Sequence, residues 1–160
     1  MIKISCYKTK LDLLPKIFCQ LAQKCYLSSI NTCVITNNSD FTTELDRILW
    51  TYSRKYFIPH ATNQDKFAIE QPIYITDSIE NPNNSKIIIL VNPLEENLLE
   101  LFANHNNINF ETLEKIIIIF DDNQKIQYSE IKIILLKAKF NNFEINLFEQ
   151  TNDGLWQTIR

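Results

Sequence analysis

The sequence contains one glycine, Gly154, among 160 residues. Loops that bind nucleotide phosphates need several glycines, because only a backbone without side chains approaches the phosphates closely. A P-loop and a dinucleotide-binding fingerprint are therefore both absent from this sequence. Their absence counts against a nucleotide-dependent enzyme.

The sequence also shows no recognisable metal site. None of its four cysteines forms a Cys-x-x-Cys pair, and it contains only two histidines. Structural zinc sites are built from such pairs or from cysteine and histidine clusters. We therefore expect no bound metal and no cofactor. We expect buried, inert thiols in a reducing cytosol for Cys6, Cys19, Cys25 and Cys33.

Long apolar runs and an excess of basic residues are missing as well. No run of about 18 apolar residues exists, and the N-terminus lacks the features of a signal peptide, so we expect a cytoplasmic protein without membrane contact. The net charge of −3 argues against a broad phosphate-binding surface, so any contact with DNA should be indirect. The length and the 45 % apolar content favour one domain over residues 1–160.

Strands and helices alternate along the predicted chain. Two continuous apolar runs, at 86–91 and 115–120, are typical of central parallel strands. Shorter strands are predicted at 2–8, 32–36, 72–76 and 143–148, the last at a sheet edge. Helices are predicted at 15–27, 40–52, 94–102 and 125–141. The remaining segment, 61–71, reads as a loop anchored by Phe67 and Ile69. This alternation predicts an α/β fold, a Rossmann-like three-layer fold with a mostly parallel central sheet flanked by helices.

The segment from Leu45 to His60 combines a helix end with a short extended stretch. Pro59 forces Ile58 into an extended conformation, so the helix cannot continue to this point. Four side chains should lie close together here: Trp50, Phe57, Pro59 and His60. Large aromatics beside a proline are typical of a protein-binding hot spot. The alternative is that Trp50 and Phe57 are ordinary core aromatics.

The spacing of this segment resembles the signature of a known family. Leu45-Asp46, Leu49-Trp50, Phe57 and Pro59-His60 are similar to the signature segment of the chi subunit of bacterial DNA polymerase III. The resemblance extends weakly to the C-terminal Asp153-Gly154-Leu155-Trp156. It implies a non-enzymatic adaptor of the clamp-loader complex with an α/β fold. One surface would bind the psi subunit, or an equivalent clamp-loader or helicase partner, through the positions of Trp50, Phe57, Pro59 and His60.

The predicted last helix carries two apolar stripes and several lysines. Apolar surface rimmed by lysine suits a ligand with an acidic body and a hydrophobic end, although the lysines could simply solvate the helix. The resemblance implies a site here for the acidic tail of single-stranded DNA-binding protein. In that site Lys132 takes the first basic position, while Leu135 and Leu136 replace an aromatic residue and a lysine. The residues expected to hold the tail are Phe120, Lys132, Leu135 and Lys139.

A pair of carboxylates supports the main alternative. Asp121 and Asp122 follow a predicted central strand, at the sheet edge where α/β proteins bind ligands, and they could hold magnesium. His60 could then serve as a general base in a small nucleotide- or metal-dependent α/β enzyme. The competing interpretations are that the carboxylates cap the next helix and that His60 is packed or faces a partner.

Overall fold

A computed structural model describes residues 1–103, 107–123, 126, 128–138 and 142–159. Within these residues the strands form one eight-stranded sheet, in the order β3-β4-β2-β5-β6-β1-β7-β8. Every described pair of neighbours is parallel except β7 and β8. The strands are β1 (Ile2–Thr9), β2 (Thr32–Ile35), β3 (His60–Thr62), β4 (Ile73–Thr76), β5 (Ile87–Val91), β6 (Lys115–Asp121), β7 (Phe143–Gln150) and β8 (Trp156–Ile159).

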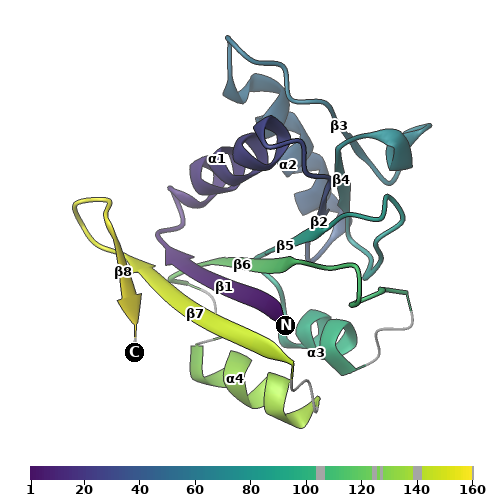
Figure 1. Ribbon diagram of the computed structural model, residues 1–160. Helices are drawn as coiled ribbons and strands as arrows, with labels where there is room; N and C mark the ends of the chain where they lie inside the picture. The colour runs from purple at the N-terminus through teal and green to yellow at the C-terminus, as the bar shows by residue number, and fades with distance from the viewer. Residues whose placement is uncertain (104–106, 124–125, 127, 139–141, 160) are drawn as a thin grey trace.

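Helices cover both faces of this sheet, as Figure 1 shows. The first pair, α1 (Leu14–Leu27) and α2 (Ser39–Tyr52), packs on one face. The second pair, α3 (Glu95–Ala103) and α4 (Tyr128–Lys137), packs on the other. The predicted three-layer α/β fold, with its mostly parallel sheet, is confirmed. No helix among the described residues is long and apolar enough to cross a membrane.

The central strands are apolar on both sides because each side faces its own core. In β5, Ile88 and Leu90 join the core under α3 and α4, whereas Ile89 and Val91 join the core under α1 and α2. Side chains alternate along a strand, so a strand buried on both faces reads as a continuous apolar run.

Local signals explain where α1 and α2 begin. Pro15 lies in the first turn of α1, where its missing N–H costs no helical hydrogen bond. The side chain of Asn38 accepts a hydrogen bond from the backbone N–H of Phe41 at 2.8 Å and so caps α2. The ends of both helices match the prediction.

The structure differs from the prediction in segment 61–71, which is not wholly loop. His60–Thr62 adds the edge strand β3, and Ala68–Glu70 forms a short 3-10 helix, η1. Phe67 and Ile69 are 70 % and 55 % exposed, so neither anchors the segment, and the buried residue is Ala68. The backbone of Phe67 is left-handed (φ 57°), which turns the chain at this point. The small side chain of the next residue, Ala68, is buried.

Two further differences concern the C-terminal part. Strand β7 lies between β1 and β8 and is not an edge strand, because the short polar strand β8 pairs with it. The predicted helix 125–141 is found as Tyr128–Lys137, and its predicted ends fall partly on residues 125, 127 and 139–141, outside the described part of the chain.

Candidate partner-binding site

The end of α2 and the segment before β3 bring several aromatic rings together. The ring centroids of Trp50 and Phe57 lie 5.4 Å apart, and those of Trp50 and His60 lie 4.8 Å apart. Trp50 is 55 % exposed and Phe57 is 63 % exposed. These exposures differ from those of core aromatics, so the two rings form an apolar surface open to solvent.

The local backbone explains how this surface is held. Ser53 ends α2 by adopting an extended conformation, and its Oγ accepts hydrogen bonds from the backbone N–H groups of Lys55 and Tyr56. Ile58 then enters the core beneath α2 and is 2 % exposed. Pro59 follows and is half-buried. The segment carrying Phe57 is therefore fixed at both ends.

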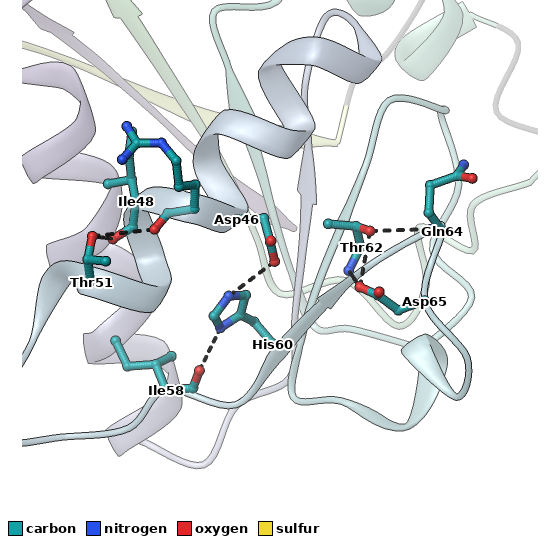
Figure 2. A network of polar contacts seen from close by, with 9 residues as sticks. Asp46, Ile48, Thr51, Ile58, His60, Thr62, Gln64 and Asp65 are labelled. Carbon is teal, nitrogen blue, oxygen red and sulfur yellow. Dashed lines mark hydrogen bonds and ion pairs between the residues drawn. The ribbon is translucent and has the colours of Figure 1, made fainter.

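His60 is buried and lies against the ring of Trp50. Figure 2 shows its imidazole between Asp46 and the carbonyl of Ile58. Its Nδ1 is 2.7 Å from the carbonyl oxygen of Ile58, which can only accept, so Nδ1 carries the proton of that hydrogen bond. Its Nε2 is 3.2 Å from Oδ1 of Asp46. Nε2 makes no well-aligned hydrogen bond within the described residues, so the contact with Asp46 is mainly electrostatic. This contact is attractive when Nε2 of His60 and Oδ1 of Asp46 share one proton.

Asp46 links His60 to Trp50. Its carboxylate lies against His60 and near the side chain of Trp50. Burial raises the pKa of the Asp46 carboxyl, and the nearby Asp65 adds to this, while the neighbouring His60 and Trp50 oppose it. One carboxylate thus orients both the exposed indole and the buried imidazole.

Sequence reasoning missed this role of Asp46. From the sequence alone, the two carboxylates Asp46 and Glu44 would both be expected on a solvated helix face. Glu44 does lie there, paired with Arg47 at 2.7 Å. Asp46 instead points toward β3, and the four-residue spacing from Asp46 to Trp50 is the signal that could have indicated a contact on one helix face.

The residues predicted to bind an acidic tail are divided between surface and core. Lys132 is exposed on α4, but Phe120 and Leu135 are 2 % and 0 % exposed and belong to the core. Leu135 faces the sheet because it shares a stripe with Ile131. The accessible apolar residues of α4 are Ile133 and Leu136, at 47 % and 69 % exposure, which differs from the expected floor of Phe120 and Leu135. Lys139 lies outside the described residues.

A hollow of about 230 Å³ lies beside this helix. Its lining combines apolar and charged side chains, namely Glu95, Ile126, Glu130, Ile133, Ile134 and Lys137. Charges of both signs border it. Lys132 stands outside this lining, on the exposed side of α4.

The residues of the alternative enzyme site do not come together. His60 begins the edge strand β3 and Asp121 ends the interior strand β6, so they lie at opposite ends of parallel strands, with β4, β2 and β5 between them. Asp121 is buried and accepts hydrogen bonds from Asn92 Nδ2 and from the backbone N–H of Asn123, both at 2.8 Å. It stabilises a turn and does not cap α4, which begins at Tyr128.

Groups of three or more potential metal ligands are absent from the described residues. The four cysteines are free and buried, as expected from the sequence. Burial raises the pKa of the Cys6 and Cys19 thiols to about 12, which disfavours the reactive thiolate.

Comparison with known proteins shows the family to which this chain belongs. Residues 1–131 match the family described as DNA polymerase III chi subunit, HolC. The chain is also 33 % identical over 159 residues to a protein of Rickettsia prowazekii (strain Madrid E) named "Probable DNA polymerase III subunit chi". That alignment covers 99 % of this chain and 93 % of the relative. The chain belongs to the DNA polymerase III chi subunit family, a family of replication accessory subunits.

Proposed function

We propose that this chain is a cytoplasmic adaptor of the clamp-loader complex, acting as one domain without catalysis of its own. It bridges a psi subunit, or an equivalent partner, to the tail of single-stranded DNA-binding protein. The observation that carries the proposal is the pair of exposed, preorganised rings of Trp50 and Phe57 on a member of the chi family.

The surface formed by Trp50, Phe57, Pro59 and His60 supports a protein partner. Aromatic rings supply much of the binding energy in protein interfaces, and rings already fixed in place lose little freedom on binding. His60 is buried and supports the surface from below, while Trp50 and Phe57 contribute the area that a partner covers.

The second surface of the proposal is the exposed side of α4. Lys132 would meet the carboxylates of an acidic tail, with Lys139 as a further cation, and the hydrophobic end of the tail would contact Ile133 and Leu136. Phe120 and Leu135 would support this surface from the core. Exposed ion pairs contribute only about 0 to 1 kcal/mol each, so we expect micromolar or weaker affinity.

Binding to the purified psi subunit, or to the clamp-loader core where psi is absent, tests the first surface by calorimetry. Trp50→Ala should abolish binding. It should lower the free energy of unfolding by less than the about 3 to 5 kcal/mol that is lost when a core aromatic is replaced by alanine. Ile69→Ala is the matched control, because Ile69 is also 55 % exposed but belongs to η1. Equal binding by wild type and Trp50→Ala would refute this surface.

Calorimetry with a short acidic peptide that ends in an aromatic residue tests the second surface. Lys132→Glu should weaken binding, and the wild-type affinity should fall as salt rises, because exposed pairs are screened within about 10 Å at 0.1 M. Lys66→Glu reverses the charge of another exposed lysine and should have no effect. Undiminished binding by Lys132→Glu would place the tail elsewhere.

A further inference from the structure

A third surface lies on the face of the sheet that carries α1. Helix α1 packs against β6 and β2, and within the described residues no helix covers β7 and β8 on this side (Figure 1). Three aromatic rings gather here, from β1 (Tyr7), β7 (Phe148) and β8 (Trp156). The rings of Tyr7 and Phe148 stack with centroids 5.0 Å apart, and Trp156 meets Tyr7 edge-on at 5.1 Å.

Two hollows adjoin these rings along α1. Both are lined by Tyr7, Leu21 and Lys24, so they form one continuous groove between α1 and the sheet. The hollow of about 120 Å³ reaches Trp156, which is 37 % exposed, and the hollow of about 140 Å³ reaches Lys115. The groove therefore has the aromatic rings of Tyr7 and Trp156 at one end, and two lysines, Lys24 and Lys115, in its otherwise mostly apolar lining.

The two lysines that line this groove, Lys24 and Lys115, have a third lysine, Lys3, beside them. Lys3 and Lys115 are direct partners in the β1–β6 register, so their side chains leave the same face of the sheet. Among the described residues, none of Lys3, Lys24 and Lys115 has a carboxylate within 4.0 Å. Glu144 is the β7 partner of Lys3, but its Oε1 accepts a hydrogen bond from Asn146 Nδ2.

Like charges placed directly opposite each other destabilise a sheet. Burial lowers the pKa of the Lys115 ammonium, and the neighbouring positive charges of Lys24 and Lys3 lower it further. A protein of net charge −3 thus holds three cations together at a cost to its own stability. An anion bound between them would offset that cost.

We propose that this groove binds a short segment of single-stranded DNA directly, in contrast to the indirect contact that the net charge of the whole chain led us to expect. Bases would stack on Trp156 and Tyr7, and phosphates would lie between Lys24 and Lys115. Single strands present flat rings and anions in alternation, and stacking platforms flanked by basic side chains bind them with little dependence on sequence. The site shares no residue with the Trp50 surface or with α4, so it does not depend on the proposed partners.

Tryptophan fluorescence measures this binding directly. The chain has two tryptophans, so Trp50→Phe leaves Trp156 as the reporter. A dT oligonucleotide of about 12 nucleotides should quench it saturably. The affinity should fall with salt with a log–log slope of about −1.4, from two lysines at about 0.7 each.

Charge reversal locates the phosphates. In the Trp50→Phe background, Lys24→Glu and Lys115→Glu should each weaken binding several-fold and reduce the salt slope by about 1. Lys55→Glu, an exposed lysine beside Tyr56, is the matched control and should bind as tightly as its parent. Circular dichroism establishes that each variant is folded.

Three outcomes would overturn the proposal. The first is absence of quenching at low salt, and the second is equal binding by folded Lys24→Glu and its parent. The third is a different ligand preference. Inorganic phosphate or dTMP binding as tightly as the oligonucleotide would indicate an anion site only, and tighter binding by an acidic, aromatic-ended peptide would indicate a peptide site.

Discussion

Replacing Asp46 with alanine tests whether this carboxylate organises the exposed rings. The variant removes the carboxylate that lies 3.2 Å from His60 Nε2 and near the Trp50 side chain. His60 is buried, and a buried polar atom that loses its partner costs about 1 to 3 kcal/mol. Removing a partly buried carboxylate also relieves its own desolvation, which offsets part of this cost. We therefore expect unfolding to become easier by about 1 to 2 kcal/mol.

Glu44→Ala is the control on the same helix. Alanine improves the helix propensity of both variants to a similar degree. Glu44 pairs with Arg47 on the exposed side of α2, so we expect no measurable loss in the free energy of unfolding. Urea unfolding followed by far-ultraviolet circular dichroism gives both free energies without relying on Trp50. In a Trp156→Phe background, Asp46→Ala should also change the emission of Trp50, because the indole loses a nearby carboxylate. Equal stability of Asp46→Ala and Glu44→Ala, with unchanged Trp50 emission, would refute this role.

Three further predictions follow from burial and pKa. Leu135→Ala should lower the free energy of unfolding in urea by about 2 to 5 kcal/mol, whereas Leu136→Ala should leave it almost unchanged. Similar losses for the two variants would contradict the orientation of α4. The raised pKa of Asp46 means that, between its unfolded value near 3.8 and its folded value, the native state binds more protons than the unfolded state. Stability should therefore fall as pH rises through that window, and Asp46→Asn should flatten this part of the profile. The buried thiols should resist Ellman's reagent in the native protein and react after unfolding; rapid native labelling of Cys6 or Cys19 would contradict their burial.

Local signals in the sequence were sufficient for the layers of the fold. The apolar runs of β5 and β6 indicated strands buried on both faces, and alternating helices indicated a mostly parallel sheet. Pro59 indicated where α2 could not extend, and α2 ends at Tyr52. These features depend on side-chain periodicity and backbone restriction within a few residues, which the sequence contains directly.

The contacts that make up the candidate sites needed the tertiary structure. Asp46 meets His60 because β3 lies beside α2, and Lys3 meets Lys115 because β1 inserts between β6 and β7. Strand β8, a short and polar strand, exists because β7 offers it a partner. Leu135 faces the core and Leu136 faces solvent because of how α4 rotates on the sheet. Each of these outcomes depends on pairing between distant segments, which local periodicity does not encode.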